Sequence, residues 1–141
     1  GWPVPFTRRR FTKGRAPRRG ELVLYRSPET AHGDLLLGYI AGLPGERVQI
    51  DEGVLQINDA PVREPSALAE IRFDAPTDSA PYGRSRSKAY SLVPERHYFV
   101  LGEAPDEEPD SRALGWVPHE NIVGAATAVW WPPTRWRRIR L

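Results

Sequence analysis

Three consecutive residues with different polar chemistry, Asp110, Ser111 and Arg112, end an acidic run that reads GEAPDEEPDSR. A carboxylate and a guanidinium can form a charge-assisted pair, and the hydroxyl between them can hydrogen-bond a neighbouring group. The run therefore has three possible roles: a metal site, a loop that only caps itself, or one part of an active site whose other groups lie elsewhere in the chain.

The composition argues against a metal or any other cofactor. The chain contains no Cys, which removes thiolate chemistry and Cys-based zinc sites. Its three histidines, His32, His97 and His119, lie far apart and have neither H-x-x-x-H nor H-E-x-x-H spacing. There is also no Gly-rich loop of a nucleotide-binding type. We expect no metal and no cofactor.

The elements that must position these side chains are predicted to be short β-strands. A chain of 141 residues with 15 Pro and 12 Gly has the size of one domain and is interrupted too often for long helices. GELVLYRS at 20–27 alternates apolar and polar residues, and DLLLGYIAGLPGERVQI at 34–50 predicts two strands around a GLPGE turn. We therefore predict an all-β fold.

The clearest local pattern is RVQIDEGVLQINDAPV at 47–62, which predicts a β-hairpin because two alternating stretches meet at DEG and Gly53 suits a left-handed turn position. Residues 64–92 read instead as a loose, partly flexible insert, with only Ile71 and Phe73 as strand-like anchors.

Strand patterns resume after the insert. RHYFVLGE at 96–103 is strand-like and aromatic, and GWVPHENIVGAATAVWWP at 115–132 has two apolar segments on either side of a turn at PHEN. The prolines that follow end the last strand.

The chain ends are basic although the net charge is only +2. Residues 1–20 carry seven Lys and Arg residues and no acid, and the C-terminus reads RWRRIRL. Such ends suit an anionic membrane surface, nucleic acid, or a solvated tail. Trp130, Trp131 and Trp136 beside arginines fit an interfacial belt at headgroup depth, or simply core positions.

Three blocks of the sequence resemble, in order, the type I signal peptidases, membrane-bound Ser/Lys endopeptidases that remove signal peptides from exported proteins. They match the strand after the family's nucleophile, its KRVxGLPGD segment with the hairpin GxLxING, and its YFVxGDNxxxSxDSRxxG box with VPxxxIxGxA. The blocks cover roughly residues 12–136 and read GELVLYRSP, YIAGLPGERVQIDEGVLQINDAPV and VPERHYFVLGEAPDEEPDSRALGWVPHENIVGAATAVWWPPTRW.

The resemblance implies a signal-peptidase-like fold of coiled antiparallel β-sheets with hairpins and a loose insert at about 64–92. We expect residues 1–19 to be a basic arm that covers the nucleophile segment, and residues 20–141 to form the β domain. Under the resemblance, Asp110 and Arg112 brace the floor of the active site by their charge-assisted pair, and Ser111 hydrogen-bonds the general base.

The two catalytic positions of the family are altered. Its serine lies eight residues before the Gly of GD, which corresponds here to Thr12 in TKGRAPRRGE, where the rest of the motif is also changed. Its base lysine lies four residues before the first Gly of GLPG, which corresponds to Gly38. A glycine cannot accept a proton, and the chain's only lysines are Lys13 and Lys88.

The sequence thus predicts a signal-peptidase-like protein of the export pathway that lacks the Ser/Lys dyad and acts as a binding or accessory pseudoenzyme. The expected partners are extended signal peptides or exported preproteins, with Thr12, Gly38 and Tyr39 lining the inactive site. Tyr39 either fills the space that the base lysine leaves or is an ordinary packed strand residue.

We expect the protein at the extracytoplasmic face of the bacterial plasma membrane, in contact with the membrane surface. The sequence begins with Gly1 and contains no Met, so it reads as a fragment, with any transmembrane anchor outside it. An alternative is a divergent active signal peptidase that uses Thr12 with another base. A nucleic-acid-binding module rests on the arginine-rich ends alone, so we do not expect nucleic acid as a partner.

Overall fold

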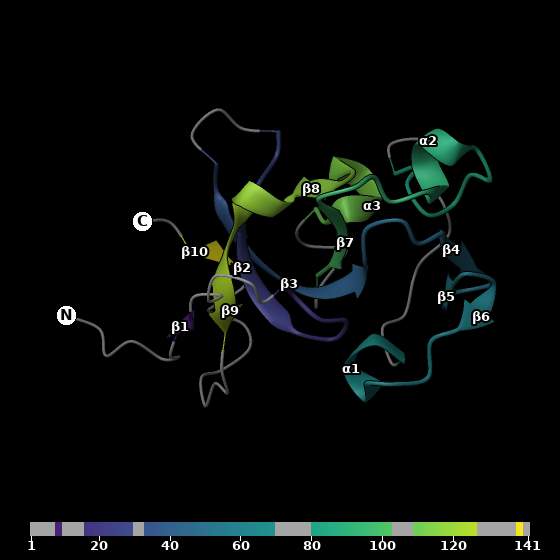
Figure 1. The fold of residues 1–141 in the computed structure, drawn as a ribbon, viewed down its shortest axis with the longest axis horizontal. Coiled ribbons are helices and arrows are strands. Elements are labelled where there is room, and N and C mark those ends of the chain that lie inside the picture. The colour runs from purple at the N-terminus through teal and green to yellow at the C-terminus, as the bar shows by residue number, and fades with distance from the viewer. Residues whose placement is uncertain are drawn as a thin grey trace.

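A computed structural model describes residues 8–9, 16–29, 33–69, 80–102, 109–126 and 138–139. Within these ranges the chain forms two antiparallel sheets and three short helices (Figure 1). The helices are α1 (Ser66–Ala69), α2 (Lys88–Ser91) and α3 (Ser111–Leu114). The strands are β1 (Arg8–Arg9), β2 (Leu22–Arg26), β3 (Leu35–Gly42), β4 (Val48–Asp51), β5 (Val54–Ile57), β6 (Ala60–Pro61), β7 (His97–Leu101), β8 (Val117–Pro118), β9 (Ile122–Ala126) and β10 (Arg138–Ile139).

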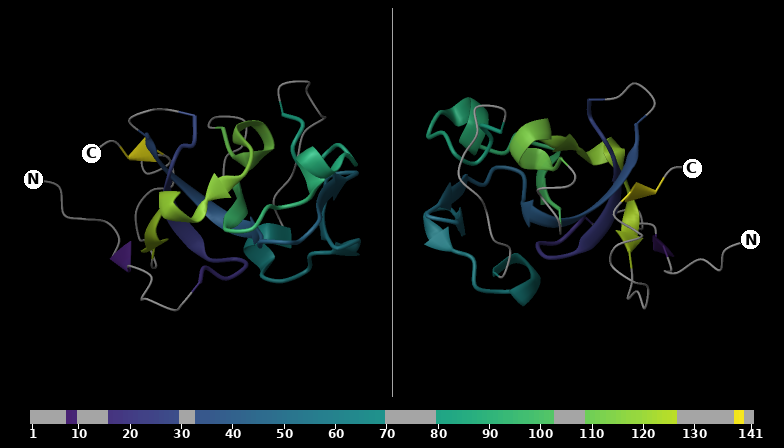
Figure 2. Two further views of the ribbon diagram at one scale, coloured as in Figure 1. Left: turned by 45° about the horizontal axis from the view of Figure 1, so that its top comes forward. Right: turned by 180° about the vertical axis from the view of Figure 1, so that it is seen from behind.

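The larger sheet has the strand order β1-β9-β2-β3-β7-β8, and β10 pairs in addition with β3. The smaller sheet has the order β4-β5-β6. β1 and β10, the first and last strands, lie at one end of the molecule, and the smaller sheet lies at the other, as two further views agree (Figure 2). The larger sheet therefore joins segments from both chain ends to the middle of the sequence.

β3 is the central strand of the larger sheet. Its pairing with β2 aligns Val23 with Gly38, and its pairing with β7 aligns Tyr39 with Leu101. β10 pairs with the first two residues of β3, so that Ile139 lies opposite Leu35. Because β2 occupies one edge of β3, β7 and β10 share the other.

The hydrophobic core consists of two clusters, one on each face of β3 and β7. Successive side chains on a strand point to opposite faces, which divides both strands between the clusters. The first cluster is formed by Ala41, Val48, Leu55, Ile57, Leu68, Val93, Phe99 and Leu101. The second is formed by Val23, Tyr25, Leu36, Ile40, Tyr98, Val100 and Val117.

The predicted all-β fold is confirmed, as are the strands at 20–27, 34–50 and 96–103. The hairpin at DEG is confirmed as well: Asp51 pairs with Val54, and both turn residues, Glu52 and Gly53, have positive φ angles of 48° and 78°. Two positive φ angles in a two-residue loop match the right-handed twist of the flanking strands.

The C-terminal pattern is confirmed as far as Ala126 by β8, a 3-10 turn at His119–Asn121 and β9, whereas residues 127–132 and the prolines predicted to end the strand lie outside the described residues. The predicted insert contains α1, whose Leu68 is fully buried against the first core cluster, an anchor that the sequence reading missed. The predicted anchors Ile71 and Phe73 lie outside the described residues. No helix within the described ranges is long and apolar enough to cross a membrane.

Candidate functional site

Gly38, the position that the resemblance aligns with the family's base lysine, lies in the middle of β3 and is buried. A Cβ atom added there would stand 2.5 Å from Val100 Cγ1 and 3.0 Å from the carbonyl oxygen of Leu101. It would also stand 3.3 Å from Tyr25 Cε1. Carbon atoms pack favourably at about 3.5–4.0 Å, so neighbouring atoms already occupy the space that a side chain would need.

Tyr39 does not fill that space. It is the next residue of β3, so its side chain points to the opposite face, where it packs against the first core cluster. Gly38 faces Tyr25 and Val100, which belong to the second cluster. Of the two interpretations of Tyr39, the structure thus favours a packed strand residue.

The residues Asp110 and Ser111 cover the outer edge of β7. The Ser111 hydroxyl accepts a hydrogen bond of 2.8 Å from the N–H of Val100, and Asp110 Oδ2 accepts one of 3.1 Å from the N–H of Gly102. β8 pairs only with His97 and Tyr98 at the start of β7, so side-chain oxygens take over as acceptors where the neighbouring strand ends. Val100 thus links the two positions: its backbone N–H donates to Ser111, and its side chain lies where a Cβ of residue 38 would be.

Asp110 has further partners in its own segment. It caps α3 by accepting from the N–H of Arg112, and it pairs with the Arg112 guanidinium at 3.0 Å between Nε and Oδ1. The two side chains are only 2% and 9% exposed. Burial makes such a pair sensitive to the loss of either partner, because the remaining charge would be left in a nonpolar environment.

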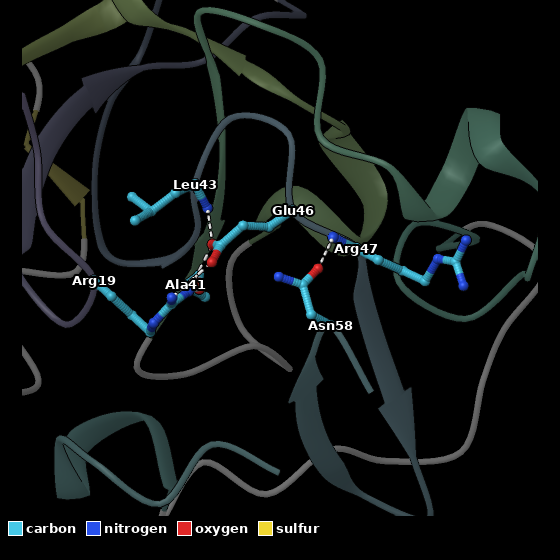
Figure 3. Close-up of polar contacts among 6 residues, drawn as sticks. All are labelled: Arg19, Ala41, Leu43, Glu46, Arg47 and Asn58. Atoms are coloured by element: carbon cyan, nitrogen blue, oxygen red, sulfur yellow. Dashed lines mark hydrogen bonds and ion pairs between the residues drawn. The ribbon is translucent and has the colours of Figure 1, made fainter. Parts of the chain in front are cut away.

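A second ion pair fixes the turn between β3 and β4. Arg19 donates from Nη1 and Nη2 to the two carboxylate oxygens of Glu46, each at 2.7 Å, and Nη1 also donates to the Ala41 carbonyl at 3.0 Å (Figure 3). Glu46 Oε1 accepts in addition from the N–H of Leu43, at 2.7 Å. This carboxylate therefore holds the GLPGE turn and ties it to the segment that precedes β2.

The electrostatic setting of Glu46 follows from these contacts. Partial burial by itself raises the pKa of the carboxyl, but the hydrogen bonds from Arg19 and Leu43 and the charge of Arg19 outweigh it, so its pKa lies below the ordinary value. The same pairing raises the pKa of Arg19. The sequence reading missed this pair, because nothing local relates an arginine and a glutamate 27 residues apart.

The structure does not describe every residue that the sequence analysis singled out. Thr12, His32, Lys13 and the three C-terminal tryptophans lie outside the described residues. His97 contacts the Glu95 carbonyl, whereas His119 contacts the hydroxyl of Tyr98. No group of three or more acidic or histidine side chains in the described part of the chain could hold a metal ion.

Comparisons with known proteins agree with this arrangement. The family model described as "Signal peptidase, peptidase S26" matches residues 6–131. A signal peptidase I of Rickettsia typhi is 32% identical over 82% of this chain, and one of Leptolyngbya laminosa is 31% identical over 84%. These matches span 53% and 55% of those relatives, so the chain spans about half their length.

A solved structure shows the same fold. The crystal structure of a signal peptidase I from Enterococcus faecalis aligns with 80% of this chain and 98% of its own, with a TM-score of 0.59 and 27% identity. The residues that the family model matches include the β3 turn, the hairpin and the Asp110 segment. The chain belongs to the signal peptidase family.

Proposed function

We propose that this chain is a catalytically inactive signal peptidase homologue that binds the extended signal-peptide region of exported preproteins. The observation that carries the proposal is the packing at Gly38, the position that corresponds to the general base. A Ser/Lys mechanism needs a neutral amine within hydrogen-bond reach of the nucleophilic hydroxyl. Position 38 offers no side chain, and Val100, Tyr25 and the Leu101 carbonyl occupy the place of one.

Peptide binding does not depend on the missing base. An extended peptide can add to the edge of a sheet through main-chain hydrogen bonds, while shallow pockets select small side chains. The backbone around the site is held by Ser111 and Asp110 on β7 and by Arg19 and Glu46 at the turn. These contacts hold the strands in place, which favours a sheet edge that is already ordered before a peptide binds.

Two assays on the same peptide test the proposal. The peptide carries a signal sequence with an Ala-x-Ala site, and mass spectrometry follows its cleavage by the wild-type chain, by Thr12→Ala and by an active signal peptidase as positive control. We expect no cleavage by the wild type beyond that of Thr12→Ala. Cleavage that is specific to the wild type and lost in Thr12→Ala would establish an active enzyme and overturn the proposal.

Binding is measured separately by fluorescence anisotropy of the labelled peptide. The matched control has the same sequence with N-methylated backbone amides around the Ala-x-Ala site, which removes the donors that β-addition requires. We expect binding of the unmodified peptide only. Equal binding of the two peptides, or none, would contradict recognition through a sheet edge.

We further propose that the protein works at the extracytoplasmic membrane surface. Support comes from the basic, Trp-containing C-terminal sequence, because each Lys or Arg near anionic headgroups contributes about 1 kcal/mol. Flotation with phosphatidylcholine vesicles, with and without phosphatidylserine, tests this location. Binding that requires phosphatidylserine and weakens with salt is expected, and no binding to either vesicle would contradict it.

A further inference from the structure

The backbone groups of β3 point alternately to its two edges. The N–H of Ile40 donates to Glu21 and its carbonyl accepts from Gly20, at 2.9 and 2.7 Å, so Ile40 faces the β2 side. In an antiparallel ladder, every second residue exchanges hydrogen bonds with the same neighbour. The backbone groups of Tyr39, Leu37 and Leu35 therefore face the opposite edge.

Two different strands occupy that opposite edge. β7 begins its pairing at Tyr39, opposite Leu101, and β10 pairs at Leu35, opposite Ile139. Leu37 lies between the two paired positions, next to Gly38. The stretch of edge from Leu35 to Leu37 thus adjoins the position of the lost base, and the chain's own C-terminal strand covers its far end.

We infer that β10 acts as an internal competitor for an extended peptide at the Leu35–Leu37 edge of β3. This inference rests on the proposed peptide-binding function. A peptide that adds along Leu35–Leu37 must pair with the same backbone groups of Leu35 that β10 uses, so both cannot be bound together. A ladder of two residues has few hydrogen bonds to lose, which makes it displaceable.

The competition lowers the apparent affinity for the peptide. If the peptide binds only molecules in which the edge is free, its apparent affinity is its intrinsic affinity multiplied by the fraction of such molecules. The occupied edge also cannot pair with a second exposed strand, so β10 protects it in the absence of peptide. Loss of β10 is therefore expected to strengthen peptide binding rather than weaken it.

β1 provides a control within the same molecule. It is also a two-residue strand near a chain end, but it pairs with β9, where Arg9 lies opposite Ala125, and the strand order places β9 and β2 between it and β3. Ile139→Pro removes the N–H that pairs with Leu35, and Arg9→Pro removes an N–H from β1. Ile139→Ala keeps the N–H, and a chain that ends at Arg137 removes β10 completely.

Two measurements on these variants test the inference. In Ile139→Pro and in the shortened chain, we expect amide exchange of Leu35 and the affinity for the labelled Ala-x-Ala peptide each to rise about tenfold. Exchange of Leu36, whose N–H faces β2, stays unchanged. Arg9→Pro and Ile139→Ala keep the wild-type affinity, and melting curves confirm that each variant is folded.

The outcomes separate the two proposals. Equal peptide affinity in all variants, with faster Leu35 exchange in those that lack β10 pairing, overturns the competition and leaves the peptide site intact. No peptide binding in any variant overturns the proposed function and the competition with it. If amide exchange of Leu35 is unchanged in the shortened chain, β10 does not pair with Leu35, and the competition is overturned.

Discussion

Arg19 and Glu46 hold each other through two parallel contacts of 2.7 Å, one from each terminal nitrogen of the guanidinium. The pair joins the segment before β2 to the turn that follows β3 and Gly38. Because Glu46 also accepts from the Leu43 N–H, its charge stabilises the turn and its anchorage together. The side chains are 28% and 17% exposed, so water screens the pair only in part.

Glu46 is expected to make the free energy of unfolding depend on pH in the acid range. Its pKa is lowered in the folded chain, so the unfolded chain takes up the proton first as pH falls below about 4.3, the ordinary pKa of a glutamate. The contribution of Glu46 is thus complete at neutral pH and is lost at acid pH. Glu46→Gln should lower the free energy of unfolding by about 1–2 kcal/mol at pH 7 and less at pH 3.

Urea unfolding at several pH values between 7 and 3 measures this difference. Glu120→Gln, which removes an exposed carboxylate of the 3-10 turn, is the matched control and should change stability by less than about 0.5 kcal/mol. A constant difference between wild type and Glu46→Gln across this pH range would contradict the role of the charge.

Gly38 should be intolerant of a single methyl group. Alanine normally stabilises a strand relative to glycine, but here its Cβ would lie 2.5 Å from Val100 Cγ1. We expect Gly38→Ala to lower the free energy of unfolding by about 1–3 kcal/mol, the usual cost of overpacking. Chemical unfolding should show a smaller destabilisation by Gly38→Ala in a Val100→Ala background, because Val100→Ala removes Cγ1, the atom closest to the new Cβ.

Gly102→Ala is the control for this experiment. A Cβ at position 102 would meet its nearest neighbour, Asp110 Cβ, at 3.8 Å, an ordinary contact distance. Gly102→Ala should change the free energy of unfolding by less than about 0.5 kcal/mol. If Gly38→Ala were as well tolerated as Gly102→Ala, there would be room at position 38 after all.

Ser111 should stabilise the protein through one buried hydrogen bond. Ser111→Ala leaves the N–H of Val100 without its acceptor in a place where Ser111 is fully buried. Such a loss costs about 1–3 kcal/mol. Amide exchange at Val100, followed by NMR, should accelerate together with the fall in unfolding free energy.

Ser85→Ala is the comparison for Ser111→Ala. The Ser85 hydroxyl also accepts from a backbone N–H, that of Ser87, at 3.2 Å, but at an exposed position where water can replace it. Its loss should change stability by less than about 0.5 kcal/mol. Similar effects of the two substitutions would show that the Val100 contact is worth no more than a surface hydrogen bond.

The strands were predictable because their signals are local. Alternation of apolar residues and the turn sequences GLPGE and DEG set the positions of β2 to β5, and each pattern spans fewer than about twenty residues. The order of the blocks identified the family, because the hairpin and the Asp110 segment each match its motifs. The burial of Leu68 was missed because a four-residue helix has no periodicity to detect.

The contacts of the site were less accessible to sequence reasoning. Gly38 was singled out by its spacing from GLPG. Its close packing, however, depends on Val100, which is more than sixty residues away along the chain. The pairing of Arg19 with Glu46 and of β10 with β3 is likewise nonlocal. Nothing in the neighbouring sequence specifies these partners, because tertiary folding alone brings them together.

The close packing at Gly38 also limits how this chain can evolve. Any side chain that arises at position 38 by one substitution meets Val100 Cγ1 and the Leu101 carbonyl before it can gain a use. The closest of these atoms belongs to the Val100 side chain, so a compatible change at Val100 would relieve the tightest contact. A lysine at position 38 is therefore separated from this sequence by at least two coupled mutations, with a less stable intermediate if position 38 changes first.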